Sequence, residues 1–242
     1  DIHQDSEMYA MEAFQSGQTS LREIELNEIG SEVAGKKLLH LQCHFGQDSI
    51  SWGRMGAEVT AMDFSDRAIE KGRELASKED FDVRFICCNT YDLPNHLDEQ
   101  FDIVFASYGV IGWLPDMEKW AEVVARFVKP GGFFYLAEFH PVLWMMDDDV
   151  RKIEYSYFDR GVIAYEESDY TDHEGKHGST KNYAWNHGLS EVMNPLLKQG
   201  LQLAFFHEHD FSPYDCFKTA VSVGPLRWQV KDYEGVFPLV YS

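Results

Sequence analysis

The sequence predicts an α/β fold in which helices cover both faces of a mostly parallel, doubly wound sheet. Residues 38–65 have the pattern of a buried strand, a tight loop with one glycine, a short helix and a second strand that ends in an acid. Strand-like runs then alternate with helical patterns as far as residue 139. The last two strand-like runs, residues 201–206 and 236–241, have no helical periodicity between them, which predicts an antiparallel pair at the end of the sheet.

Composition limits the size of the core and the kinds of partner. With 242 residues, of which 44% are hydrophobic, the chain can bury one sizeable core, so we expect a single domain over residues 1–242. The net charge of −20 disfavours a nucleic-acid partner, because binding to a polyanion needs clustered Lys and Arg. No stretch approaches the ~20 apolar residues of a membrane span, and the first residues lack the pattern of a signal peptide. These features predict a cytoplasmic protein without membrane or nucleic-acid partners.

The cysteines and histidines do not predict a metal site. The four cysteines have neither metal-ligand spacing nor the arrangement of a secretory disulfide framework. His207 and His209 would share one face of a strand, but the sequence defines no third ligand beside them. We therefore expect no bound metal.

Further elements follow from periodicity and capping residues. Residues 4–34 have a loose apolar stripe, which predicts helical structure in this segment. The hydroxyl of Ser65 is expected to cap a helix that ends near Lys78, and Pro115 is expected to start another. Further strands are expected at residues 83–88, 101–107 and 133–139, and a further helix at 189–198, interrupted at Pro195.

Residues 142–187 are expected to form a small β-rich insertion after the fifth strand. Acidic residues outnumber basic ones between residues 147 and 175. Aromatic and polar residues alternate at 155–158 and 162–165, which predicts antiparallel strands. An insertion at this point lies above the carboxyl edge of the sheet, so we expect it to form the roof of a substrate site.

The loop HLQCHFGQ, residues 40–47, has the position of a nucleotide-binding loop. Gly46 gives the backbone room before the following helix begins. The next strand ends at Asp63, which this unit places beside the loop at the edge of the sheet where open parallel sheets bind nucleotides. An ionised carboxylate there can accept two hydrogen bonds from the vicinal hydroxyls of a ribose.

The sequence resembles the class I S-adenosylmethionine-dependent methyltransferases, in particular the methyltransferase type 11 kind, in four stretches: HLQCHFGQ, VTAMDFS, FDIVFASYGVIGWLPD and KPGGFFYLAEFHP. The resemblance covers residues 30–145. It implies a Rossmann-like sheet of seven strands with an antiparallel C-terminal strand, S-adenosyl-L-methionine as cofactor and S-adenosyl-L-homocysteine as product. It also implies that the N-terminal segment, residues 1–34, forms a helical cap over the cofactor. The chain departs from the family where His40, Gln42 and His44 replace the acid and the first two glycines of the usual loop.

The resemblance also implies which residues bind the cofactor. Asp63 is expected to bind the ribose, Asn89 to accept a hydrogen bond from the adenine amino group, and Thr90 to present its backbone N–H to the ring. For Asn89 an ordinary turn is an equally weighted alternative. We expect Gly46→Val to clash with the methionine portion and abolish binding while leaving the protein soluble. The remaining predicted cofactor-binding residues are Gln42, Phe64 and Ser107.

Two residues are candidates for catalysis, Tyr108 and His140. Tyr108 follows the central strand at the end where the reactive methyl should point, and with Trp113 it forms either an aromatic wall around the sulfonium or ordinary packing. Glu138 and His140 lie near the carboxyl edge, where a general base would be useful. A purely structural pair is the alternative for both.

Methyl transfer to a small-molecule acceptor is the function that these features predict. The methyl group of the cofactor is already activated, so the protein must align the nucleophile, the methyl carbon and the sulfur, and exclude water. A nicotinamide-dependent oxidoreductase is one alternative. Such an enzyme usually has the motif G-x-G-x-x-G in this loop, where this chain has Gln42 and His44. A protein that binds the cofactor without transferring its methyl group is another.

Overall fold

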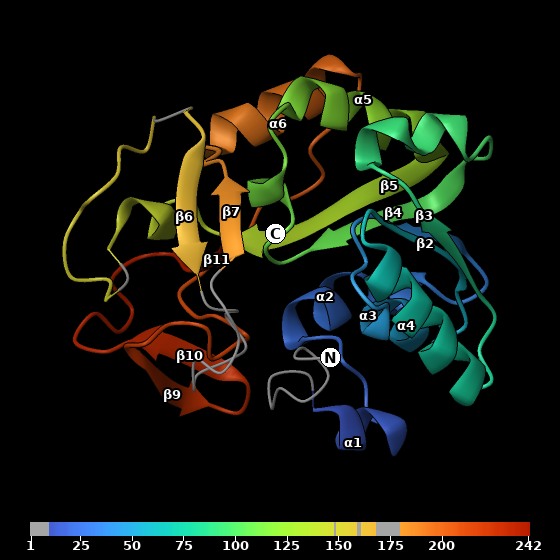
Figure 1. Cartoon of the computed structure of the whole chain (residues 1–242), viewed down its shortest axis with the longest axis horizontal. Helices are drawn as coiled ribbons and strands as arrows, with labels where there is room; N and C mark the ends of the chain where they lie inside the picture. Colours follow the sequence, from blue (N-terminus) through green and yellow to red (C-terminus); the bar gives the residue numbers. More distant parts are fainter. Residues whose placement is uncertain (1–9, 148, 159–160, 168–179) are drawn as a thin grey trace.

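A seven-stranded sheet with strand order β3-β2-β1-β4-β5-β11-β8 forms the centre of the molecule (Figure 1). The structure is a computed structural model that describes residues 10–147, 149–158, 161–167 and 180–242. The parallel strands are β1 (Lys37–His40), β2 (Glu58–Asp63), β3 (Val83–Cys87), β4 (Phe101–Ser107) and β5 (Val128–Phe139). β11 (Val240–Tyr241) is antiparallel to both β5 and β8 (Glu208–His209). The predicted doubly wound sheet with an antiparallel C-terminal strand is therefore confirmed.

The strands at the end of the sheet are shorter than expected. Residues 201–206 do not form a strand, because Leu201 and Phe206 pack on the main core while the residues between them remain without a partner strand. The strand bonds begin only where His207 and Ser242 exchange backbone hydrogen bonds. The connection from β8 to β11 contains an antiparallel hairpin that the sequence did not predict. Its strands are β9 (Ala220–Gly224) and β10 (Arg227–Val230).

Helices cover both faces of the sheet (Figure 1). One face carries α2 (Glu23–Ile29), α3 (Gln47–Arg54) and α4 (Asp66–Lys78), and the other carries α5 (Met117–Phe127) and α6 (Leu189–Lys198). The predicted cap is present, since Ser65 Oγ accepts a hydrogen bond from the Ala68 N–H at 3.2 Å. The start of α5 is capped by Asp116, whose side chain accepts from the Lys119 N–H. α6 runs through Pro195 without the expected interruption, because Val192 and Leu196 anchor it in the core.

The N-terminal segment is not one long helix. Instead α1 (Met11–Gln15) and α2 are separate, because Gly17 adopts a φ of +100° and ends the first of them. α2 begins with the Glu25 side chain accepting from the Arg22 N–H at 2.5 Å. Residues 1–9 lie outside the described part of the chain.

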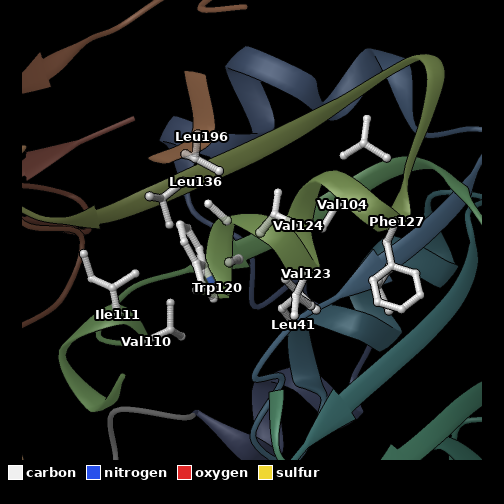
Figure 2. Close-up of a cluster of buried hydrophobic side chains, with 14 of the residues drawn as sticks. Leu41, Val104, Val110, Ile111, Trp120, Val123, Val124, Phe127, Leu136 and Leu196 are labelled. Carbon is white, nitrogen blue, oxygen red and sulfur yellow. The ribbon is translucent and has the colours of Figure 1, made fainter. Parts of the chain in front are cut away.

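The main core lies between the sheet and the α5–α6 face (Figure 2). Trp120 is completely buried at its centre, and Figure 2 shows Val124 and Leu136 close to it. A second core of apolar side chains lies under α2, α3 and α4. The two cores fix the sheet between them, so the loops at the carboxyl ends of the strands stand on a rigid base.

In the described part of the insertion, β6 (Ile163–Glu167) and β7 (Thr180–Ala184) form an antiparallel hairpin. The strand expected at residues 155–158 is absent, because the Tyr157 hydroxyl instead accepts a hydrogen bond from the Leu189 N–H at the start of α6. Much of the acidic stretch expected here, at residues 148, 159–160 and 168–179, lies outside the described residues. After β7, the Trp185 N–H bonds to Gly112 O at 2.9 Å, which ties the insertion to the segment that follows β4.

Candidate functional site

The loop after β1 is shaped by backbone conformation rather than by several glycines. Gln42 and His44 both adopt positive φ angles, 54° and 52°, which glycine adopts at lower cost. The His44 N–H donates to Asp63 Oδ2 at 2.9 Å, and the Gln42 N–H donates to the sulfur of Met62 at 3.4 Å. The loop therefore folds back onto the end of β2 even though the usual glycines are replaced.

Gly46 is required by its backbone and by a neighbouring ring. Its φ is +75°, and a Cβ atom added there would lie 2.7 Å from Phe85 Cε1. A larger side chain would strain this backbone and require the Phe85 ring to move. That such a substitution leaves the protein soluble stays a prediction. Contact between Gly46 and a cofactor stays a prediction.

Asp63 at the end of β2 is held in one orientation by backbone amides. Asp63 is buried, with only 7% of its surface exposed. Its Oδ1 accepts a hydrogen bond from the Ser65 N–H at 2.9 Å, and its Oδ2 accepts one from the His44 N–H. Burial raises the pKa of Asp63, and the amides of Ser65, His44 and Phe64 oppose that rise. A carboxylate has about four lone-pair positions, so Asp63 keeps capacity to accept from a ligand.

The predicted adenine-binding residues lie near Asp63 at the ends of β2 and β3. Phe64 is 74% exposed, which is unusual for an aromatic side chain beside a buried acid. Asn89 Oδ1 accepts from the Tyr91 N–H at 2.9 Å and begins a 3₁₀ turn, so the turn that was the alternative for Asn89 is present. Thr90 is buried, and its hydroxyl lies 3.8 Å from the sulfur of Met62. Adenine recognition by these residues stays a prediction.

Ser107 and Tyr108 at the end of β4 connect the sheet to helices α3 and α2. The Ser107 hydroxyl lies near the Asp48 carboxylate in the first turn of α3, where it opposes the rise that burial causes in the pKa of Asp48. The Tyr108 hydroxyl donates to Glu25 Oε2 at 2.8 Å. The aromatic neighbours of Tyr108 are Phe139 and Tyr214, with ring centres 6.0 and 5.1 Å away. Trp113 lies in a separate 3₁₀ turn, so Tyr108 is packed against these two rings rather than paired with it.

A cluster of ionisable side chains beside Tyr108 was missed from the sequence. Its members are Arg22, Glu25, Asp48, Tyr108 and Tyr214, which we call the α2 charge cluster. Burial, with a further contribution from Asp48, raises the pKa of Glu25 to about 7. The Arg22 guanidinium carbon lies 4.4 Å from the centre of the Tyr214 ring. The available signal was the position of Glu25, which falls on the apolar stripe of α2 with Leu21 and Ile29.

Backbone N–H groups of the fold fill the acceptor positions of Glu138 at the end of β5. It is 2% exposed, and its two oxygens accept four backbone hydrogen bonds of 2.5 to 3.3 Å. The donors are the N–H groups of Gly109, Val110, Ile111 and Phe139. The structural alternative is thus present for Glu138, which fixes the segment that leaves β4.

His140 has structural partners as well. Its Nδ1 accepts from the Val142 N–H at 3.2 Å, and its Nε2 lies 3.2 Å from Glu208 Oε1 on β8. Burial lowers the pKa of His140, and the carboxylate of Glu208 opposes that effect. These contacts place the imidazole against the last strands of the sheet. A catalytic role for His140 stays a prediction, as does one for Tyr108.

His207 and His209 both lie near the Glu28 carboxylate, and their ring centres are 6.4 Å apart. His207 Nδ1 lies 2.7 Å from Glu28 Oε1, and His209 Nε2 lies 3.4 Å from the Ser242 hydroxyl. Within the described ranges, no group of three or more His, Cys, Asp or Glu side chains is arranged to hold a metal ion. Over the same ranges, the helices are too short or too polar to cross a bilayer.

Comparisons with known protein sequences place this geometry in context. Residues 39–136 match the family model described as a methyltransferase domain. A demethylmenaquinone methyltransferase from Clavibacter sepedonicus is 32% identical over 123 residues, which cover 51% of this chain and 49% of that protein. A ubiquinone biosynthesis O-methyltransferase from Proteus mirabilis is 28% identical over 123 residues, which cover 50% of each protein. The chain thus spans about half the length of the curated relatives it matches.

A solved structure has the same fold over most of the chain. It is a crystal structure of an S-adenosylmethionine-dependent methyltransferase from Mesorhizobium loti, which aligns with a TM-score of 0.54 and covers 81% of this chain and 87% of that chain. At 17% sequence identity this likeness shows the fold alone. It agrees with the Rossmann-like sheet. The segment matched by the family model contains the loop after β1, Asp63, Asn89 and Ser107.

Proposed function

We propose that this chain, whose residues 39–136 are a methyltransferase domain of the class I S-adenosylmethionine-dependent type, transfers a methyl group from S-adenosyl-L-methionine to a small molecule. The observation that carries the proposal is the state of Asp63. Backbone amides hold this carboxylate at the carboxyl end of β2, and it keeps acceptor capacity for the two hydroxyls of a ribose. The S-adenosyl-L-homocysteine product would be held in the same way.

The residues around Asp63 fit the rest of an adenosyl group and its amino-acid tail. The exposed ring of Phe64 offers a face on which a base can stack. Gln42 donates from Nε2 to Val110 O, while its Oε1 is buried and has no partner among the described residues. A buried acceptor without a donor is costly, and an ammonium group of a bound ligand would satisfy it. These features support binding of S-adenosyl-L-methionine.

The chemistry asks little of the protein beyond orientation and the exclusion of water. S-Adenosyl-L-methionine supplies a methyl group activated by a sulfonium, so reaction is an in-line displacement at carbon. The end of β4 presents Tyr108, whose ring is attractive to a cation, and Glu138 fixes the backbone immediately after it. This rigid segment would hold the acceptor on the side of the methyl carbon opposite the sulfur, so that the new bond to carbon forms as the carbon–sulfur bond breaks.

The insertion and the N-terminal segment would complete the acceptor site. We assign residues 142–187 as its roof, because the Trp185 N–H bonds to Gly112 and the large side chains of Trp113, Trp144 and Tyr183 are 41–48% exposed. Residues 1–34 would form the cap. Exposed aromatic side chains suit an apolar ring, which agrees with relatives whose names refer to demethylmenaquinone and ubiquinone. A cytoplasmic location and the absence of nucleic-acid partners stay predictions.

A nicotinamide-dependent oxidoreductase is less well supported. A pyrophosphate must approach the start of a helix closely, and a loop with glycines permits this. Here Gln42 and His44 carry side chains at positive φ in that loop. A methionine tail, with its own ammonium and carboxylate, tolerates a more polar loop.

Calorimetric titration separates these functions. We expect S-adenosyl-L-homocysteine to bind and NADH not to bind, and the reverse result would favour the oxidoreductase. Incubation with S-adenosyl-L-methionine and a panel of hydroquinones, catechols and aromatic amines should then produce S-adenosyl-L-homocysteine only when an acceptor is present. Binding without turnover on any member of the panel would favour a protein that only holds the cofactor.

A further inference from the structure

The α2 charge cluster contains more acidic than basic groups at the end of β4. Glu25 is completely buried, and Asp48 and Arg22 are its charged neighbours. One guanidinium thus stands against two carboxylates. The Arg22 Nε is buried and has no partner among the described residues, so this cation is not fully engaged by the two acids.

Each element packed against Glu25 contributes a defined group. On α2 itself, the Arg22 N–H donates to Glu25 Oε1 at 2.5 Å. From the end of β4, the Tyr108 hydroxyl donates to Oε2 at 2.8 Å. From α3, the negative charge of Asp48 acts on Glu25. Two further tyrosines face Glu25, namely Tyr214 and, on β5, Tyr135. Burial and the charge of Glu25 raise the pKa values of both hydroxyls, so they remain protonated.

Asp48 links the cluster to the predicted cofactor site. Its carboxylate accepts from the Ser20 hydroxyl at 2.5 Å, and the nearby hydroxyl of Ser107 opposes the rise that burial causes in the pKa of Asp48. Ser107 ends β4, and Asp48 lies two residues after Gly46 in the first turn of α3. The negative charge therefore lies between the loop after β1 and the end of β4, which is the space proposed for the methionine portion and the sulfonium.

In the free protein, an ionised Glu25 would be destabilising because its charge is buried. A buried carboxylate without a matched cation is costly, and Glu25 responds by keeping its proton up to a pH of about 7, the value to which its pKa is raised. A ligand that brings a positive charge would remove the penalty and allow Glu25 to ionise. A ligand of the same shape without that charge would not.

We propose that Glu25 and Asp48 select the positively charged methyl donor over its neutral product. S-Adenosyl-L-methionine carries one net positive charge, from its sulfonium, ammonium and carboxylate, whereas S-adenosyl-L-homocysteine carries none. Loss of the methyl group therefore removes the charge that the cluster stabilises, and product release is favoured. The inference rests on the proposed function, because it requires the cofactor to occupy the site beside Ser107.

The test compares affinities for three ligands by isothermal titration calorimetry. The ligands are S-adenosyl-L-methionine, S-adenosyl-L-homocysteine and sinefungin, an analogue with a protonated amine in place of the methyl sulfonium. We expect the wild-type protein to bind both cationic ligands roughly tenfold more tightly than the neutral one, the size of effect that one partly screened charge gives. In Glu25→Gln this ratio should fall to about twofold, with the affinity for S-adenosyl-L-homocysteine little changed.

Glu23→Gln is the matched control. Glu23 lies on the same helix but is exposed and pairs with Arg227, so removing its charge should leave the ratio at the wild-type value. Titration of the wild type in two buffers of different ionisation enthalpy gives a second readout. S-Adenosyl-L-methionine should displace a proton from Glu25 near pH 7, and this release should disappear in Glu25→Gln.

Three results would overturn the inference. The first is an equal ratio of affinities in the wild type and Glu25→Gln. The second, which needs no variant and so covers the case in which Glu25→Gln does not fold, is a wild-type ratio that stays constant between pH 7.5 and 5.5, where protonation of Glu25 should lower it. The third is failure of the wild type to bind any of the ligands, which would overturn the proposed function as well.

Discussion

The ends of β2 and β5 each carry a buried carboxylate, yet the two are used differently. Asp63 accepts one short amide hydrogen bond on each oxygen, whereas Glu138 accepts two on each. Since a carboxylate offers about four acceptor positions, the fold fills Glu138 and leaves capacity on Asp63. Burial and position at the carboxyl edge are therefore shared by the two acids. They differ in the acceptor capacity that the backbone leaves unused, and this difference is the basis for proposing Asp63 as the ribose-binding residue.

The largest expected effect is on stability, when Glu138, whose acceptor positions the fold fills, is replaced. Glu138→Ala should lower the free energy of unfolding by about 3–5 kcal/mol, because the buried amides of the segment after β4 lose their acceptor. Urea unfolding followed by circular dichroism measures the change. The control Glu138→Gln keeps one amide oxygen and should lose clearly less. A loss below about 1 kcal/mol in Glu138→Ala would show that these amides do not depend on Glu138.

Glu25 extends the comparison, because it is buried like Glu138 but accepts from one backbone N–H group and one hydroxyl instead of from four backbone N–H groups. Its pKa is raised from 4.5 to about 7, so the folded state holds its proton more tightly than the unfolded state does. Wild-type stability should therefore fall as pH rises from about 4.5 to about 7, with the full penalty, about 3 kcal/mol, present above that range. Glu25→Gln lacks this group. The difference in unfolding free energy between variant and wild type should thus change in favour of the variant across the same range, and parallel pH profiles would contradict this.

The smallest effect concerns the surface beside Asp63. Phe64→Ala should weaken S-adenosyl-L-homocysteine binding by about 1 kcal/mol through lost stacking, and should change stability by less than about 0.5 kcal/mol because the ring is exposed. Phe158→Ala is the matched control, since Phe158 is exposed to the same degree but lies in the insertion. Calorimetry on both variants measures the difference. Equal affinities would remove Phe64 from the site.

Local signals predicted the half of the molecule that holds Asp63. Short apolar runs predicted β1 to β4 to within a residue or two, and the serine at the start of α4 predicted its cap. The strand–loop–helix–strand unit placed Asp63 at the end of β2, beside the loop. These features depend on residues close together in the sequence, where periodicity and capping act.

The features that were missed depend on contacts between distant segments. The α2 charge cluster exists only because α2 docks beside the end of β4, which brings Glu25 to Tyr108 across 83 residues of sequence. Gly46 is constrained by Phe85, whose ring arrives from another strand. At the far edge of the sheet, the strand pairing of β8 begins at Glu208 rather than at Leu201, because β11 supplies only two paired residues. No local pattern carries this information.

The most direct measurement is the affinity of Asp63→Ala for S-adenosyl-L-homocysteine, determined by calorimetry beside the wild type. If Asp63 binds the ribose, affinity should fall by about 1.5–3 kcal/mol, the value of hydrogen bonds to a charged group. Thermal unfolding of the same sample establishes that the variant is folded. An affinity equal to that of the wild type in a folded variant would contradict the placement of the cofactor at the end of β2.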